Sequence, residues 1–333
     1  MRTRVCYTFY SKKSTPIPQS RGGAMVKFVR GLYVATASIV ARVFLRSPRA
    51  LFALAAALGT VRYYVGYVGR GRSRPGYLAR MARALPERSC PDLERILRAF
   101  WRNHEKNFVE LFLLPKLTPA NIDRYVTFEG LASLDEALRR GTGAVLAPPH
   151  FGNERLLHLA LALKGYPLTV MTSAFEDAPD NLRRARLEPA GQAHELLFPS
   201  DNPRRLYDAV ARNRVVQFSP TAAGGTSGLW CDCFGYTLLV NTTPARVSLK
   251  TGAPLLPAFI YRRPNNRHHV VIEPPLGPPP GGGNDAAALT RTLMQRVEKR
   301  VHDDPDQFYW MWPIIRTDEA EAAGKQPPER EIP

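Results

Sequence analysis

A short apolar run that ends in two prolines and a histidine limits how this chain can fold. Residues Ala144–Ala147 carry only apolar side chains, which is typical of a strand buried on both faces. Proline cannot donate a hydrogen bond to a neighbouring strand, so the two prolines that follow leave His150 at the strand's carboxyl edge. Asn153 is a favourable helix N-cap, and residues 154–164 are expected to form a helix that Gly165 ends. The sequence therefore predicts a strand–turn–helix unit with a histidine in the turn.

Strand-like and helix-like segments alternate along the chain from Tyr125 onward. Strands that alternate with helices of about ten residues favour βαβ units. The predicted fold is an α/β domain with a mostly parallel central sheet flanked by helices. Residues 230–239 are expected to be irregular. Strands are expected at residues 125–129, 144–147, 168–172, 215–219, 255–261 and 268–273, and helices at residues 131–140, 154–164, 203–212, 245–251 and 286–302.

The turn after the 144–147 strand carries residues suited to proton transfer. Imidazole titrates near neutral pH, so His150 can take a proton from a hydroxyl. The carboxylate of Glu154 can orient the imidazole and stabilise the imidazolium. Open α/β sheets commonly place their chemistry at this edge. The alternative interpretation is that His150 fills or caps the turn and that Glu154 caps the helix.

Charge is distributed unevenly along the chain. The formal net charge is +17, which alone is typical of a protein that binds nucleic acid. However, sixteen of the 46 Lys and Arg residues lie in residues 1–86, and no Asp or Glu precedes Glu87. The rest of the chain is therefore nearly neutral, and the positive charge belongs to the N-terminal segment. We expect no nucleic-acid partner.

Two apolar runs, residues 31–41 and 50–61, lie in the same basic segment. Neither reaches the roughly 18–20 uncharged residues of a transmembrane helix. Apolar runs between arginines suit a helix that lies in the interface of an anionic membrane. Three alternatives stay open. The segment could be an arginine-rich targeting peptide, a single span with snorkelling arginines, or a basic arm that binds nucleic acid.

No metal or nucleotide site is indicated by the remaining motifs. Cys231-Asp-Cys233 has no second pair of ligands at a spacing typical of zinc sites. The glycine-rich residues 224–228 lack the lysine and the spacing of a phosphate-binding P-loop.

These patterns divide the chain into three parts. Residues 1–86 form the basic, apolar membrane-associated segment, and residues 87–316 form the α/β domain. The domain is expected to begin with a helix from Cys90 to Leu114, where apolar positions recur at helical spacing. Residues 317–333 lose the apolar pattern and are expected to be a disordered tail.

Over roughly residues 86–316 the chain resembles the late acyltransferases of lipid A biosynthesis and the related phosphatidylinositol-mannoside acyltransferases. The order of several motifs carries the resemblance. They are Phe128-Glu-Gly130, Leu134-Asp-Glu-Ala-Leu138, Gly141-Thr-Gly143, His150-Phe-Gly-Asn153, Thr251-Gly-Ala-Pro-Leu-Leu-Pro257 and Pro305-Asp-Gln-Phe-Tyr-Trp310.

The resemblance implies an enzyme of the glycerolipid acyltransferase-like fold, bound to the membrane at its N-terminus. It would transfer a fatty acyl chain from an acyl-carrier-protein or coenzyme A thioester to a hydroxyl of a lipid A-type glycolipid. His150 and Glu154 would be catalytic, and no metal or bound organic cofactor would be needed. The implied location is the cytoplasmic face of a bacterial inner membrane. A phospholipid or phosphatidylinositol-mannoside acceptor, or an inactive lipid-binding relative, are the alternatives.

The chain also departs from the family pattern. Glu154 follows His150 one residue sooner than the usual carboxylate, and Arg155 stands in the usual position. Residues 220–228 lack the Asp and the later Arg that usually follow the preceding strand. By resemblance, Gly152 and Asn153 contact substrate, and Arg183 and Arg186 contact an anionic headgroup. The alternative for the two arginines is the polar face of a helix.

Overall fold

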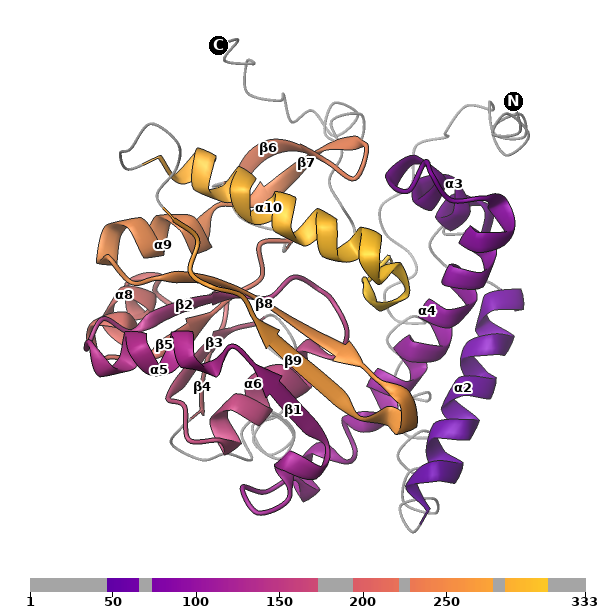
Figure 1. Cartoon of the computed structure of the whole chain (residues 1–333), viewed down its shortest axis with the longest axis horizontal. Coiled ribbons are helices and arrows are strands. Elements are labelled where there is room, and N and C mark those ends of the chain that lie inside the picture. Colours follow the sequence, from indigo (N-terminus) through magenta and orange to yellow (C-terminus); the bar gives the residue numbers. More distant parts are fainter. Residues whose placement is uncertain (1–46, 66–73, 173–193, 222–227, 278–284, 311–333) are drawn as a thin grey trace. The chain divides into compact units, whose positions relative to one another are not determined.

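The computed structural model describes residues 47–65, 74–172, 194–221, 228–277 and 285–310 (Figure 1). These residues belong to two compact units, which divide between Leu113 and Leu114. Among the described residues, those of the first unit form helices, and both sheets lie in the second unit. The helix that was expected at the start of the α/β domain lies in the first unit.

Three helices make up the described part of the first unit: α2 (Pro48–Val65), α3 (Arg74–Ala84) and α4 (Cys90–Glu110). Ser89 caps α4 by accepting a hydrogen bond from the backbone N–H of Asp92, and a proline follows in the first turn. Helix α4 ends at Glu110, one turn earlier than expected. None of the described helices combines the length and the apolar character needed to cross a membrane.

Helix α2 packs along α4 through small and aromatic residues on one side. A side chain at Gly59 would collide with the backbone of Trp101, so glycine permits the close approach of the two helices. Arg62, which interrupts the apolar run, forms an ion pair with the buried carboxylate of Glu105. The other side of α2 is apolar and exposed.

The second unit is built on a seven-stranded sheet with the strand order β1-β9-β8-β2-β5-β3-β4. Neighbouring strands are parallel except for β8 and β9, which form an antiparallel pair. The predicted mostly parallel α/β sheet is thus confirmed. The strands are β1 (Val126–Glu129), β2 (Ala144–Ala147), β3 (Leu168–Met171), β4 (His194–Leu197), β5 (Val215–Gln217), β8 (Leu255–Arg262) and β9 (His268–Ile272).

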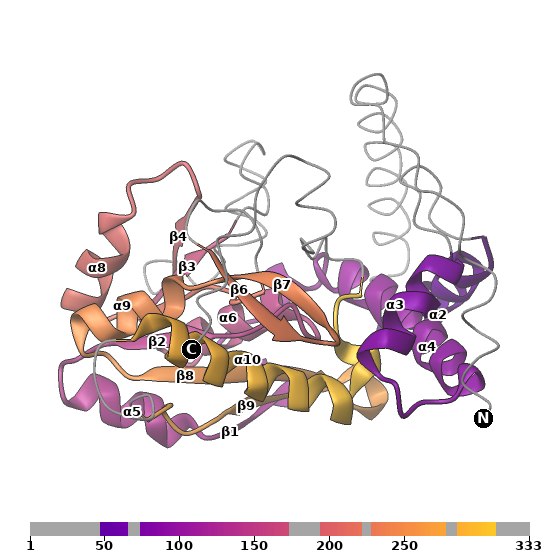
Figure 2. The same cartoon turned by 90° about the horizontal axis from the view of Figure 1, so that it is seen from above.

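Helices cover the sheet, as the βαβ pattern predicted. One face packs against α8, α9 and α10 around a core that includes Val145, Val216 and Leu255 (Figure 2). Helix α6 packs on β3 and β8, and all of its residues from Leu156 to Leu163 are buried. The helices of this unit are α5 (Leu131–Arg139), α6 (Glu154–Leu163), α8 (Arg204–Ala211), α9 (Thr243–Thr251) and α10 (Ala286–Asp303), with short 3-10 turns at Leu114–Lys116, Ile122–Arg124, Pro264–Asn266 and Pro305–Gln307.

The segment expected to be irregular, residues 230–239, is instead an antiparallel hairpin. Strands β6 (Gly228–Cys233) and β7 (Tyr236–Asn241) are joined by Phe234 and Gly235, which both have positive φ angles of 53° and 68°. Two left-handed residues give the turn whose twist suits a hairpin, but phenylalanine seldom occupies such a position, so the sequence signal was weak. The backbone N–H of Phe234 donates to Glu298 and ties the hairpin to α10.

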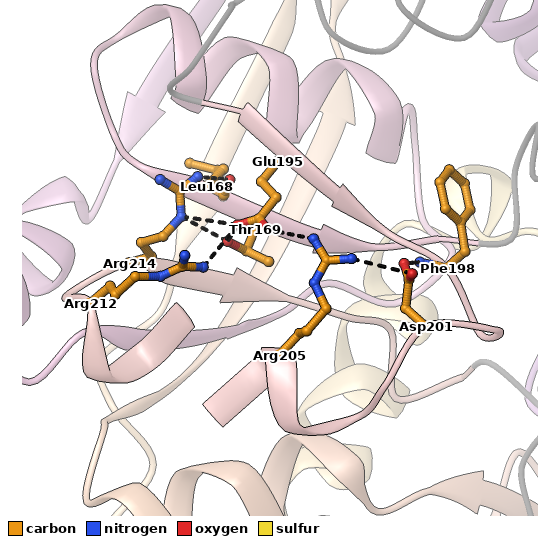
Figure 3. A network of polar contacts seen from close by, with 8 residues as sticks. All are labelled: Leu168, Thr169, Glu195, Phe198, Asp201, Arg205, Arg212 and Arg214. Atoms are coloured by element: carbon orange, nitrogen blue, oxygen red, sulfur yellow. Dashed lines mark hydrogen bonds and ion pairs between the residues drawn. The ribbon is translucent and has the colours of Figure 1, made fainter. Parts of the chain in front are cut away.

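A network of charged side chains lies at the end of the sheet where β3 and β5 begin (Figure 3). The carboxylate of Glu195 lies 2.9 Å from Arg205, 3.3 Å from Arg212 and 3.6 Å from Arg214. Arg214 also donates to the hydroxyl of Thr169 at 2.8 Å. These contacts join β3, β4 and β5 to α8, at the edge opposite to that of His150.

Candidate functional site

His150 lies just beyond the carboxyl end of β2, where the sequence placed it. Strand β2 is fully buried, and its neighbour β5 runs parallel to it. Because the carboxyl ends of parallel neighbours meet at one edge, the residues that follow β5 reach the same place. Ser219 and Thr221 are those residues, and both contact the imidazole of His150.

The Nδ1 atom of His150 is held by two hydroxyl groups. Thr221 Oγ1 lies 2.7 Å from Nδ1, and Ser219 Oγ lies 3.2 Å from it. The two hydroxyl oxygens are 3.0 Å apart, so they can share a hydrogen bond. The backbone N–H of His150 also donates to Thr221 Oγ1, at 3.1 Å. Side chain and backbone of the histidine are thus fixed by the same threonine.

The hydroxyl-bearing segment is itself held in place. The backbone N–H of Thr221 donates to Ser219 Oγ at 3.3 Å. Asn241, at the end of β7, donates its side-chain N–H to the carbonyl of Ser219 at 3.2 Å and its backbone N–H to Pro220 at 3.0 Å. The hairpin that the sequence did not predict therefore supports the residues around His150.

Glu154 lies on the other side of the imidazole. Its Oε2 atom is 4.0 Å from His150 Nε2, and its side chain is 34% exposed whereas that of His150 is 12% exposed. Glu154 is the first residue of α6, which Asn153 caps by accepting a hydrogen bond from the backbone N–H of Leu156 at 3.3 Å. The cap and the helix were both expected from the sequence. The carboxylate faces Nε2, whereas the orienting contacts are made to Nδ1.

Burial lowers the pKa of His150 below its ordinary value, because the charged imidazolium loses hydration. The negative charge of Glu154 opposes this effect, and the positive charge of Arg155 adds to it. The net result is a lowered pKa, so the imidazole is neutral at neutral pH. A neutral imidazole can accept a proton, which is what a general base requires.

The C-terminal motif, Pro305 to Trp310, packs directly on the histidine turn. Gly152 donates its backbone N–H to the carbonyl of Gln307 at 2.8 Å, and Tyr309 donates to the carbonyl of His150 at 2.9 Å. Phe151 and Phe308 form an antiparallel bridge between these contacts. The histidine turn and the C-terminal motif, which are far apart in the sequence, thus form one structural unit.

Gly152 has a structural reason to be glycine. Its φ angle is +61°, in the left-handed region, and a Cβ atom there would lie 1.8 Å from the carbonyl oxygen of Ile260. The left-handed φ disfavours a side chain, and the close contact excludes a Cβ atom unless the backbone moves. The turn can therefore approach β8 closely only with glycine at this position.

The structure brings His150, Gly152, Asn153 and Glu154 together, as their spacing implied. Arg183 and Arg186 lie outside the described residues. Sequence reasoning missed Ser219 and Thr221, because it considered this segment only for the Asp and Arg that it lacks. A signal was present, because Ser219 ends the predicted 215–219 strand and the carboxyl ends of parallel strands meet at one edge of the sheet.

Within the described ranges, no group of three or more His, Cys, Asp or Glu side chains is arranged to hold a metal ion. Cys231 and Cys233 are buried thiols that share one face of β6.

Comparisons with known proteins agree with the resemblance. A family model described as bacterial lipid A biosynthesis acyltransferase matches residues 36–317. The phosphatidylinositol mannoside acyltransferase of Mycobacterium tuberculosis (strain H37Rv) is 27% identical over 203 residues, which cover 59% of this chain and 62% of the relative. A protein of the same name from Mycolicibacterium smegmatis is 27% identical over 177 residues, covering 52% and 57% respectively. The chain thus spans about three fifths of the length of these curated relatives.

Proposed function

Because this chain belongs to the bacterial lipid A biosynthesis acyltransferase family, we propose that it is an O-acyltransferase that transfers a fatty acyl chain from a thioester to a hydroxyl group of a glycolipid. The observation that supports this most directly is a mostly buried imidazole with a lowered pKa at the carboxyl edge of a mostly parallel sheet. A neutral base at that edge suits the activation of a hydroxyl, which is the first requirement of the reaction.

In the proposed reaction, His150 Nε2 takes the proton of the acceptor hydroxyl while the hydroxyl oxygen attacks the thioester carbonyl. The carbon–oxygen bond of the new ester forms and the carbon–sulfur bond breaks. The proton on the imidazolium then passes to the departing thiolate, which leaves as a free thiol. Glu154 stabilises the imidazolium from 4.0 Å while it exists. The reaction needs no redox step.

The acyl donor in this proposal is an acyl-carrier-protein or coenzyme A thioester. The acceptor is a lipid A-type glycolipid, in keeping with the description of the family. A phosphatidylinositol-mannoside acceptor is the second candidate, because the relatives from two mycobacterial species carry that name. Both acceptors present hydroxyl groups, so the same base would serve either one.

The proposed location is the cytoplasmic face of a bacterial inner membrane, where residues 1–86 bind an anionic surface. Sixteen basic residues in that segment support the electrostatic part of this binding. The apolar part is supported by α2, where Leu58, Val61 and Tyr64 lie on one helix side and are 46%, 57% and 62% exposed. Such a helix side suits insertion among lipid headgroups.

The direct test is turnover of a labelled acyl thioester by the purified full chain, with total membrane lipid as acceptor. Mass spectrometry of the product identifies the acceptor and separates the two candidates. Lipid profiles of a deletion strain provide the second test, because the true acceptor becomes under-acylated. Absence of thioester turnover, with the fold intact, would instead indicate an inactive lipid-binding relative.

A further inference from the structure

We infer that Ser219 and Thr221 are positioning residues that hold the Nδ1–H tautomer of His150 and leave Nε2 as the proton acceptor. This inference rests on the proposed acyl transfer and assigns the orienting task to two hydroxyls, where the sequence had assigned it to Glu154. The geometry decides between them. Both hydroxyls contact Nδ1, whereas the Glu154 carboxylate lies at Nε2.

The distances around the hydroxyl pair are compatible with this tautomer. Thr221 Oγ1 accepts from the backbone N–H of His150 at 3.1 Å and from Nδ1–H at 2.7 Å, which uses both of its lone pairs. Its own hydrogen is donated to Ser219 Oγ at 3.0 Å. Ser219 Oγ also accepts from the backbone N–H of Thr221 at 3.3 Å, so Ser219 holds in place the threonine that accepts the Nδ1–H.

The opposite tautomer would disable the base. With the proton on Nε2, the nitrogen beside Glu154 would already be protonated and could not accept the proton of the acceptor hydroxyl. The Glu154 carboxylate favours that tautomer, because an N–H facing it would be attracted to its charge. The hydroxyl pair therefore opposes the preference for a protonated Nε2 that the nearby Glu154 carboxylate creates.

Hydroxyl groups differ from a carboxylate at Nδ1 in one further respect. A carboxylate would raise the pKa of the imidazole, whereas neutral hydroxyls add no charge. The charged and titratable groups beside His150 in the described chain are Glu154 and Arg155 from α6 and Tyr309 from the C-terminal motif. The described residues of the β5–β6 segment that contact the imidazole are the uncharged Ser219 and Thr221.

The test combines kinetics with the tautomer of His150 in the full chain. We expect the double variant Ser219→Ala/Thr221→Val to lower kcat by roughly 10–100-fold, because a buried N–H that loses its acceptor typically costs about 1–3 kcal/mol. KM for the thioester should change little. Thr221→Ser retains the hydroxyl and should restore most of the rate to the single Thr221→Val variant.

A matched control exists on β1 and β9, at one end of the strand order. Thr127 Oγ1 lies 2.9 Å from Nδ1 of His269, and Glu129 lies 3.3 Å from Nε2 of the same ring. This trio repeats the arrangement around His150 on the β1–β9 surface. Thr127→Val removes an equivalent hydroxyl and should leave kcat unchanged.

Long-range ¹H–¹⁵N spectra report which ring nitrogen of a neutral histidine carries the proton. The signals of His150 are those that disappear in His150→Gln. We expect a protonated Nδ1 in the wild type and a shift toward protonated Nε2 in the double variant. A double variant with wild-type kcat, or one with reduced kcat and an unchanged tautomer, would overturn the inference.

Failure of the proposed acyl transfer can be distinguished from failure of the inference about Ser219 and Thr221. If the wild-type chain transfers no acyl group, the proposed function fails, and the spectra still decide whether the hydroxyl pair holds Nδ1–H. If the wild-type chain is active and its neutral His150 carries the proton on Nε2, only the inference about Ser219 and Thr221 fails.

Discussion

The backbone N–H of Gly152 donates to the carbonyl oxygen of Gln307 across 2.8 Å, although the two residues lie in distant parts of the sequence. The Gln307 side chain in turn accepts a hydrogen bond from the backbone N–H of Arg262 at 3.1 Å. The C-terminal motif thus links the histidine turn to the end of β8. This link fixes the backbone of the turn that carries His150.

Gly152→Ala should destabilise the protein strongly. A left-handed φ costs about 1–2 kcal/mol for a residue with a Cβ atom. Overlap with the Ile260 carbonyl adds about 1–3 kcal/mol. Gly141→Ala is the matched control, because Gly141 has a φ of +72° and a Cβ atom at that position would have no neighbour within 4 Å. Thermal or denaturant unfolding should separate the two variants, and equal losses of stability would contradict the packing argument.

His150→Ala should abolish acyl transfer without unfolding the protein. Loss of a general base typically lowers the rate by about 10²–10⁴-fold. Turnover and melting temperature should be measured on one preparation. His269→Ala is the control, because His269 has a similar threonine and glutamate on the protein surface. Wild-type turnover by a folded His150→Ala protein would contradict the assignment of His150 as the general base.

Glu154→Gln and Arg155→Gln should move the pH dependence of kcat in opposite directions. Glu154 raises the pKa of His150 and Arg155 lowers it. The base works when it is neutral, so activity falls as the pH drops through this pKa. Glu154→Gln should therefore shift the acidic limb to lower pH, and Arg155→Gln should shift it to higher pH. Shifts in the same direction, or no shift in either variant, would contradict these opposing charge effects on the base.

Glu154→Gln should also lower kcat by about tenfold or more, because the imidazolium loses the carboxylate that stabilises it. The alternative is that Glu154 only favours the start of α6, where a carboxylate contributes about 0.3–1 kcal/mol to stability. In that case melting temperature would fall slightly and turnover would stay near the wild-type value. Both quantities measured together decide between these roles.

Serine substitutions at Leu58, Val61 and Tyr64 should weaken binding to anionic vesicles. Partial insertion of each side chain contributes about 1 kcal/mol, so the triple variant should bind roughly a hundredfold more weakly. The full chain is required, because α2 covers one side of α4 and its removal would expose apolar residues there. Vesicle sedimentation measures the effect, and unchanged binding would exclude this side of α2 from the membrane contact.

Much of the fold was predictable because it depends on local patterns. The apolar run of β2, the Asn153 cap and the alternation of strands with helices follow from neighbouring residues alone. The β6–β7 hairpin was not predictable in this way, because its turn places Phe234 in a left-handed conformation. The end of α4 was also missed, since its apolar spacing continues beyond Glu110 after the helical hydrogen bonds stop.

The sequence by itself determined that a histidine stands at the carboxyl edge of a buried strand, with a carboxylate at the start of the next helix. Only the tertiary structure decided which ring nitrogen each group faces. Ser219 and Thr221 reach Nδ1 because β5 lies beside β2 in the sheet. The order of strands in a sheet cannot be predicted from local periodicity. Likewise, the C-terminal motif supports the histidine turn because long-range packing brings Gln307 to Gly152. Contacts between distant segments depend on the arrangement of the whole sheet, which no single stretch of sequence specifies.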